Sequence, residues 1–148
     1  MLKIIKGDIL NSNCNVICHQ VNEDGYMGGG LALSIATRYP EVEKEYNEYC
    51  GYFEDRTMLY GDVFICEYDK DKYIANCFTQ RNFITSIEDI KQVFNILVPK
   101  CKKLNLTIAV PYNYGCGIAR GNWQEVYETL EDISNKYEYD IEIYQLED

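Results

Sequence analysis

The sequence predicts an α/β fold in which a mixed β-sheet lies between two layers of helices. Short runs of β-branched residues alternate along the chain with stretches whose apolar residues follow helical spacing. Both hairpin-like and crossover connections are expected, which indicates strands of mixed direction. The length of 148 residues favours one domain, residues 1–148, with a core of its own. We therefore expect a single three-layer α/β/α domain.

The first half of the chain predicts two strands, two helices and two further strands. Pro40 should end the first helix, because proline cannot continue the hydrogen-bond ladder. The charged turn at 69–71 should join the last two strands. The expected ranges are strands 2–6 and 15–20, helices 31–39 and 41–50, and strands 62–68 and 72–78.

The second half predicts a helix, a strand, a helix and a closing strand. Ser86 precedes Asp89 by three residues, a capping signal for a long helix. Pro99 lies inside that helical pattern and predicts a kink or an early break. The remaining elements are a central strand at 106–110 buried on both faces, a helix capped by Asn122 with Glu125 three residues on, and a strand at 139–146.

Composition limits the classes of partner. The net charge is −10, from 24 acidic and 14 basic residues, so extended nucleic-acid binding is disfavoured and a bound phosphate would depend on backbone donors. No apolar run is long enough to span a bilayer, and we expect no membrane partner. Seven scattered cysteines indicate buried free thiols and a cytoplasmic protein, without a structural zinc site.

Two glycine-rich loops, 21–30 and 112–122, each follow a predicted strand and lead into a predicted helix. Helix N-termini favour anions, so two such loops facing each other would suit a pyrophosphate. Either loop alone is explained by a tight turn, but two at one sheet edge favour a ligand site. The standard nucleotide motifs are absent. The phosphate-loop motif Gly-x-x-x-x-Gly-Lys would need a lysine after Gly25 and Gly30, where the chain has Leu31, and the dinucleotide fingerprint Gly-x-Gly-x-x-Gly is not present.

Four stretches together carry a family resemblance: "KGDIL" (6–10), "HQVNEDGYMGGGLA" (19–32), "IANCFTQ" (74–80) and "IAVPYNYGCGIARGNW" (108–123). In this order and spacing the chain resembles a macrodomain, the fold that binds ADP-ribose. Within the family it is similar to the group that includes the terminal ADP-ribose protein glycohydrolase, the yeast ADP-ribose-1″-phosphate phosphatase and many bacterial and phage proteins.

The resemblance implies a set of ligand-binding residues and no cofactor or metal. Asp8, beside Ile9, would accept a hydrogen bond from the adenine amino group. Tyr144 is a candidate adenine neighbour or, equally, an ordinary strand aromatic. The backbone groups expected at the distal ribose and phosphates are Gly28, Gly29 and Gly30, and those expected to wrap the pyrophosphate are Gly115, Cys116, Gly117 and Ile118.

Three departures from the family pattern bear on catalysis. One hydrolase group has an aspartate where this chain has Ala32. The terminal glycohydrolase has a lysine and an aspartate at the positions of Gln80 and Ala119. An amide cannot form a Schiff base with an opened ribose, so the lysine-dependent mechanism is not expected here.

His19, the only histidine, is the leading catalytic candidate, because an imidazole at this strand end can activate water toward a 1″-phosphate. The alternative is a histidine that orders the loop. Asn22 is expected to orient the ribose, and Asp24 or Glu23 is an alternative base, although a solvated acidic loop explains Glu23 better. Cys116 could have a lowered pKa beside a helix N-terminus, but a nucleophilic role is the minority interpretation.

The resulting expectation is a protein that binds ADP-ribose and hydrolyses ADP-ribose-1″-phosphate to ADP-ribose. Two alternatives stay open. The first is a non-catalytic ADP-ribose-binding module. The second is a hydrolase that removes ADP-ribose from modified proteins or from a nucleic-acid end. The expected partners are ADP-ribose, its 1″-phosphate and ADP-ribosylated protein.

Overall fold

A computed structural model describes residues 1–147. Its main sheet has six strands in the order β1-β8-β7-β2-β4-β3, and only β3 runs antiparallel to its neighbour. The strands are β1 (Leu2–Lys6), β2 (Val16–Gln20), β3 (Val63–Asp69), β4 (Lys72–Cys77), β7 (Ile108–Pro111) and β8 (Ile141–Gln145). The predicted mixed sheet is confirmed.

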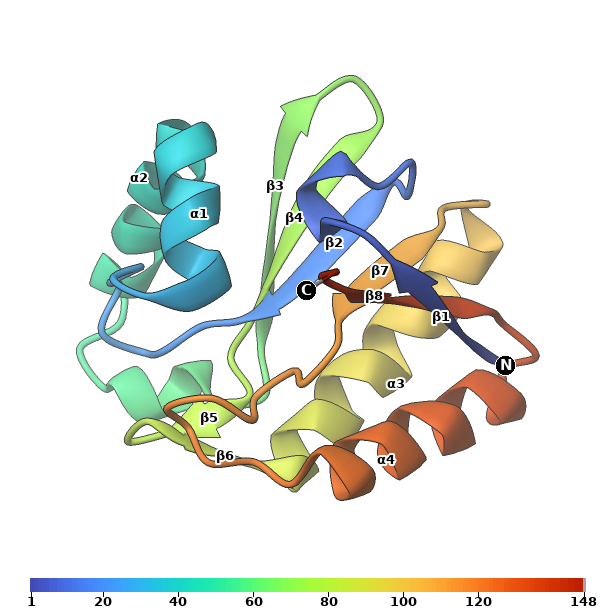
Figure 1. Ribbon diagram of the computed structural model, residues 1–148. Helices are drawn as coiled ribbons and strands as arrows, with labels where there is room; N and C mark the ends of the chain where they lie inside the picture. Colours follow the sequence, from blue (N-terminus) through green and yellow to red (C-terminus); the bar gives the residue numbers. More distant parts are fainter. Residues whose placement is uncertain (148) are drawn as a thin grey trace.

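Helices cover both faces of this sheet (Figure 1). One pair packs on the face of β2 that carries Ile17, and the other pair on the face that carries Cys18. The helices are α1 (Gly30–Arg38), α2 (Pro40–Gly51), α3 (Ile87–Lys103) and α4 (Trp123–Lys136), with short 3₁₀ turns η1 (Ile9–Asn11) and η2 (Arg56–Leu59). The three-layer α/β/α arrangement is therefore confirmed.

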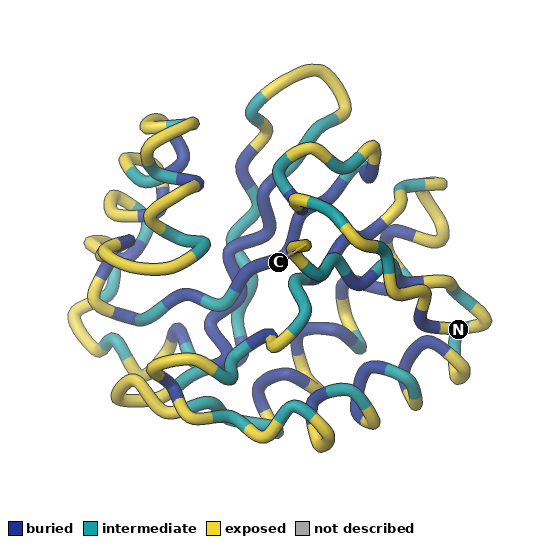
Figure 2. The backbone as a smooth tube through the Cα atoms, viewed as in Figure 1, coloured by how far each residue is buried: buried dark blue, intermediate teal, exposed yellow. Residues whose placement is uncertain are grey.

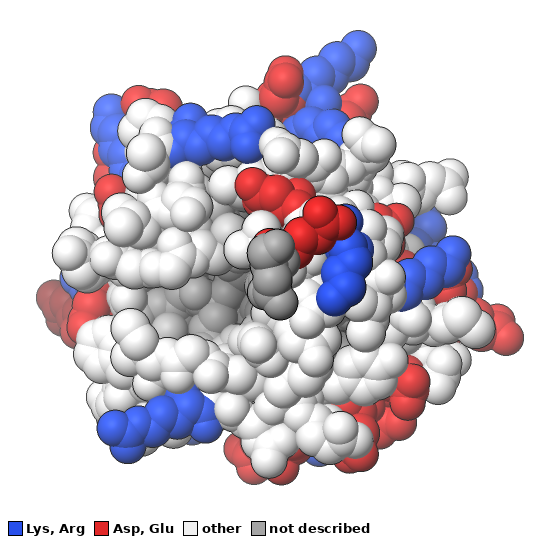
Figure 3. Space-filling view, in the orientation of Figure 1, with Lys and Arg blue, Asp and Glu red and all other residues white. Residues whose placement is uncertain are grey.

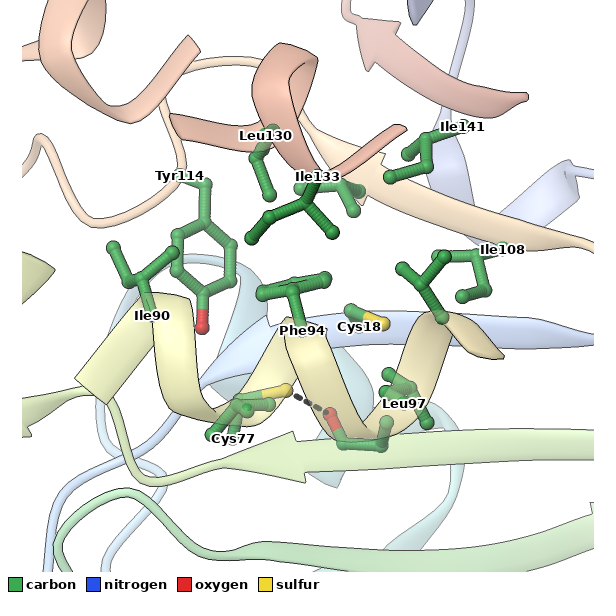
Figure 4. Packing of buried hydrophobic residues seen from close by; sticks show 14 of the residues in the cluster. Cys18, Cys77, Ile90, Phe94, Leu97, Ile108, Tyr114, Leu130, Ile133 and Ile141 are labelled. Carbon is green, nitrogen blue, oxygen red and sulfur yellow. Dashed lines mark hydrogen bonds between the residues drawn. The ribbon is translucent and has the colours of Figure 1, made fainter. Parts of the chain in front are cut away.

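Two apolar clusters hold the layers together, and the buried backbone of Figure 2 runs through the strands and the inner sides of the helices. Between the sheet and the two helices α3 and α4, the Phe94 side chain of α3 lies among Cys18, Ile108 and Leu130 (Figure 4). Strand β7 is buried at Ile108, Ala109 and Val110, as expected for a central strand covered on both faces. Six of the seven cysteines are buried, and all are free thiols.

Helix α3 continues through Pro99 to Lys103, so the expected early break is wrong. Proline lacks the N–H that would bond to the Asn95 carbonyl. Tyr137 supplies a replacement, because its hydroxyl donates to the Asn95 carbonyl at 3.3 Å and to Asn95 Oδ1 at 3.0 Å. The helix therefore has a partner for the carbonyl that proline leaves free.

The sequence patterns missed the two 3₁₀ turns and a small hairpin of β5 (Gln80–Arg81) and β6 (Ile84–Thr85), and the hairpin bears on the site. Its turn residues Asn82 and Phe83 have φ of 50° and 65°, the conformation of a turn that usually requires glycine. Arg81 anchors the hairpin through a bidentate pair with the buried Asp89 carboxylate, at 2.8 and 2.9 Å. Among the described residues, no helix is long and apolar enough to cross a membrane.

Candidate functional site

A cavity of about 640 Å³ opens where β2 and β7 end. Its wall consists of the β2–α1 loop with the first turn of α1, the β5–β6 hairpin, and the β7–α4 loop. Figure 3 shows a hollow in this face of the molecule, bordered mostly by uncharged residues. Within residues 1–147, no Asp, Glu, Lys or Arg lines the cavity. In a protein of net charge −10, an anion here would rely on backbone N–H groups.

The glycine triplet leads into α1, which begins at Gly30. Gly28, Gly29 and Gly30 all line the cavity. Gly29 is the N-cap and has no side chain to cap the helix, and no acidic residue lies in the first turn. The first N–H groups of α1 therefore have no side-chain acceptor, which is the condition for an anion site. A Cβ at Gly28 would stand 2.1 Å from the ring of the exposed Tyr26, so a side chain there would have to displace that ring.

The β7–α4 loop lines the opposite side with Gly115, Gly117 and Ile118. Gly115 has φ +70°, and a Cβ would meet Thr85 Oγ1 at 2.8 Å. The N-terminus of α4 does not contribute to the cavity wall. It is capped by Asn122, which accepts from the Glu125 N–H at 3.2 Å. The capping prediction is confirmed, but this loop offers its own backbone rather than a helix end.

Cys116 turns away from the cavity. It packs against the core under α3 and α4 and does not line the cavity. Burial raises the pKa of its thiol, so the expectation of a lowered pKa is wrong. The physical reason is that the helix N-terminus lies seven residues further on, at Trp123, too far to stabilise a thiolate.

A polar network that the sequence did not reveal ties the hairpin to both loops. Gln20 donates to Thr85 Oγ1 at 3.0 Å, and Thr85 donates to the Gly115 carbonyl at 2.5 Å. Thr79 donates to Gln20 Oε1 at 2.8 Å and shares a hydrogen bond of 2.5 Å with the Tyr114 hydroxyl. The sequence feature that could have indicated Gln20 is its position as a polar residue at the end of a strand, directly before a glycine-rich loop.

His19 lies in the cavity wall on β2, with its side chain 2 % exposed. Its Nε2 is 2.7 Å from Asn76 Oδ1, and its Nδ1 is buried without a hydrogen-bond partner. Burial lowers the pKa of His19 from 6.5 to about 4, although the Asn76 hydrogen bond acts in the opposite direction. The imidazole is therefore neutral at physiological pH.

The other loop candidates have different surroundings. Asn22 lines the cavity, but its amide holds the loop together by donating to the Tyr26 carbonyl at 2.8 Å and accepting from the Asp24 N–H at 3.0 Å. Asp24 is exposed and outside the cavity wall. Glu23 is 7 % exposed, with Oε1 3.3 Å from the Asn82 N–H and Oε2 unpartnered. The interpretation of Glu23 as a solvated acid is wrong, because the hairpin covers it.

The residues expected at adenine do not line the cavity. The exposed Asp8 caps η1 by accepting from the Leu10 N–H at 3.0 Å, and Ile9 is buried. Tyr144 lies opposite Pro111, a cavity residue, in the β7–β8 register, and its hydroxyl donates to Glu142 at 2.7 Å. Their roles toward adenine stay predictions.

Comparison with solved structures connects this architecture to a known fold. The macrodomain of Mycobacterium tuberculosis DarG superposes with a TM-score of 0.82 over 97 % of both chains, at 27 % identity. The chain has the macrodomain fold. A second structure, a protein of unknown function from Bacteroides thetaiotaomicron, superposes with a TM-score of 0.87 at 21 % identity over 98 % of both chains and supports the fold alone.

Curated relatives of this chain include phosphatases and glycohydrolases that act on ADP-ribose derivatives. An ADP-ribose 1″-phosphate phosphatase of Lodderomyces elongisporus is 31 % identical over 97 residues, which cover 60 % of this chain and 59 % of the relative. A DNA ADP-ribosyl glycohydrolase of Mycobacterium tuberculosis is 28 % identical over 136 residues, 88 % of this chain and 38 % of the relative. The chain thus spans about three-fifths or less of the length of these two relatives. No protein-family model matches the chain.

The three departures from the family pattern all lie in the cavity wall of this macrodomain. Ala32 is in the first turn of α1, Gln80 begins the hairpin, and Ala119 follows Ile118 in the β7–α4 loop. None of these side chains can donate or accept a full proton at neutral pH. Among the described cavity-lining residues, His19 is the only one that titrates between pH 3 and 8.

Proposed function

We propose that the chain binds ADP-ribose between its two glycine-rich loops and hydrolyses ADP-ribose-1″-phosphate to ADP-ribose and inorganic phosphate. The observation that carries the proposal is a cavity that no charged side chain of residues 1–147 lines and whose wall includes the N-terminus of α1, which no side chain caps. Backbone N–H groups of Gly29, Gly30, Gly117 and Ile118 are the donors we assign to the phosphates. The named activity of the fungal relatives supports the same ligand class.

Binding is tested by titrating the protein with ADP-ribose in a calorimeter. We expect saturable binding, with AMP and ribose-5-phosphate binding more weakly because each fills only one half of the cavity. Binding should weaken little with added salt, since the described cavity wall contains no lysine or arginine. The absence of binding at millimolar ADP-ribose would contradict the proposal as a whole.

In the proposed reaction, water attacks the 1″-phosphorus, the bond between phosphorus and the 1″-oxygen breaks, and that oxygen takes up a proton. We assign His19 Nδ1 the task of orienting the attacking water by accepting a hydrogen bond from it. With a pKa of about 4, the imidazole is a weak base, so positioning rather than complete proton removal is its contribution. Phosphoryl transfer depends chiefly on positioning and electrostatics, which suits this assignment.

The catalytic assignment is tested by phosphate release from ADP-ribose-1″-phosphate. We expect His19→Ala to lower kcat about 10²-fold while ADP-ribose affinity changes less. Asp24→Asn is the matched variant in the same loop, since Asp24 is the alternative base and lies outside the cavity wall. A loss of rate in Asp24→Asn alone would transfer the role to Asp24, and release of no phosphate by the wild type would leave a binding module.

A second candidate function is removal of ADP-ribose from a modified macromolecule. It is favoured by the 28 % identity to the DNA ADP-ribosyl glycohydrolase of Mycobacterium tuberculosis over 88 % of this chain. The cavity has Gln80 and Ala119 instead of the lysine and aspartate of the lysine-dependent mechanism, so this function would need another set of residues. Release of ADP-ribose from modified DNA or from glutamyl-linked protein distinguishes this function from phosphate release.

The buried free thiols support action of the protein in the cytoplasm, where thiols stay reduced.

A further inference from the structure

His19 on β2 and Asn76 on β4 form a buried polar pair behind the cavity wall. The two residues are direct partners in the parallel β2–β4 register, and both are at most 2 % exposed. His19 lines the cavity, whereas Asn76 does not. Asn76 therefore does not contact a ligand in the cavity directly, and His19 is the only one of its three side-chain hydrogen-bond partners that lines the cavity.

The orientation of the Asn76 amide follows from its second partner. Its Nδ2 lies 2.9 Å from the Phe64 carbonyl oxygen on β3, and 3.5 Å from Cys66 Sγ. A carbonyl oxygen only accepts, so the NH₂ end must face β3 and Oδ1 must face His19. Because Oδ1 only accepts as well, the hydrogen between the two side chains belongs to His19 Nε2.

This assignment fixes the state of the other ring nitrogen. A neutral imidazole with its hydrogen on Nε2 has a lone pair on Nδ1, and Nδ1 is buried without a partner. A buried acceptor left unpaired costs free energy, so a donor that enters from the cavity gains more than an ordinary hydrogen bond. An anionic oxygen has no hydrogen to offer and meets only the lone pair.

We propose that Asn76 is a positioning residue that holds His19 as the Nε2–H tautomer, so that His19 accepts a hydrogen bond from a ligand hydroxyl group or a water molecule and disfavours an anionic oxygen. The statement about the tautomer is independent of the ligand. The identity of the donor, a ribose hydroxyl or the attacking water, rests on the proposed function. In this arrangement His19 binds a hydroxyl group of the ligand, and the glycine loops bind its phosphates.

The tautomer is measured on the wild-type chain by ¹⁵N NMR after labelling of histidine. With one histidine in the sequence, the two ring nitrogens need no assignment between residues. We expect a protonated Nε2 and an unprotonated Nδ1 from pH 5 to pH 8, with no titration in that range. A protonated Nδ1, or rapid exchange between the two tautomers, would overturn the proposal without any mutation.

Two substitutions separate positioning from simple packing. Asn76→Asp places a carboxylate against Nε2, which should raise the His19 pKa and protonate Nδ1 at neutral pH. ADP-ribose affinity should then fall about tenfold or more at pH 6 and recover at pH 9. Asn76→Leu removes the acceptor without adding charge, so its loss of affinity should not depend on pH. Equal affinity and an unchanged imidazole spectrum in both variants would refute the role of Asn76.

The spectrum of the ADP-ribose complex separates this inference from the proposed function. We expect the Nδ1 resonance to shift on binding, as it does when a lone pair accepts a hydrogen bond. If ADP-ribose binds and Nδ1 does not respond, the hydroxyl-accepting role is wrong and the proposed function stands. If ADP-ribose does not bind, the proposed function and the assigned donor are both wrong, while the tautomer of the free protein is decided separately.

Discussion

Replacing Gly121 with alanine should lower the free energy of unfolding by about 2–4 kcal/mol and weaken ADP-ribose binding at least tenfold. A Cβ at this position would stand 2.4 Å from the Gly115 carbonyl oxygen, which itself accepts the Gly121 N–H at 2.8 Å. Backbone atoms on both sides would have to move, and they belong to the loop that forms one wall of the cavity. Chemical denaturation and calorimetry measure the two effects.

Gly117→Ala is the matched control in the same loop. A Cβ there has nothing within 4 Å, so stability should stay within about 0.5 kcal/mol of the wild type. Gly117 lines the cavity, so a loss of ligand affinity without a loss of stability would support close approach of the phosphates to its backbone. If Gly121→Ala were as stable as Gly117→Ala, the tight packing of this loop would be disproved.

Because His19 is buried as the neutral imidazole, we expect the free energy of unfolding to decrease as the pH falls from about 6.5 to about 4. The folded chain holds the pKa of His19 at about 4, against 6.5 for the exposed side chain. Between these values the unfolded chain binds a proton that the folded chain excludes, so stability is complete above pH 6.5 and decreases with falling pH. This difference of about 2.5 in the pKa of His19 corresponds to roughly 3 kcal/mol in the free energy of unfolding.

Comparison with His19→Asn isolates this effect, because carboxylates titrate in both proteins while the variant lacks the imidazole. We expect the difference in unfolding free energy between wild type and variant to change by roughly 2–3 kcal/mol between pH 7 and pH 4.5. Urea denaturation at the two pH values provides the measurement. Parallel pH profiles would show that the imidazole is not buried in the neutral form.

Local sequence patterns were sufficient for most of the fold. The apolar spacing of 31–39 and the cap pair Asn122–Glu125 predicted α1 and the start of α4, because amphipathic periodicity and capping act within a few residues. The two glycine loops were placed correctly for the same reason. The early break expected at Pro99 does not occur, and the donor that replaces the missing N–H, Tyr137, lies beyond the end of a different helix, α4.

The missed parts of the site depend on residues far apart in sequence. The hairpin turn at Asn82 and Phe83 carries no glycine, so no turn signal marked it. The partnership of His19 with Asn76 requires the register of two strands 57 residues apart. Burial of Glu23 follows from the same hairpin that was not expected. Pairwise geometry of this kind cannot be obtained from local spacing.

The parallel pairing of β2 with β4 has a consequence for how the protein folds. These strands are joined through α1, α2 and β3, so the loop that closes on pairing is long and its formation is entropically slow. Until the pairing forms, His19 is solvated and titrates with an ordinary pKa near 6.5. The protein thus contains an intrinsic probe of refolding, because the protonation state of its only histidine at pH 5.5 reports whether the centre of the sheet has assembled.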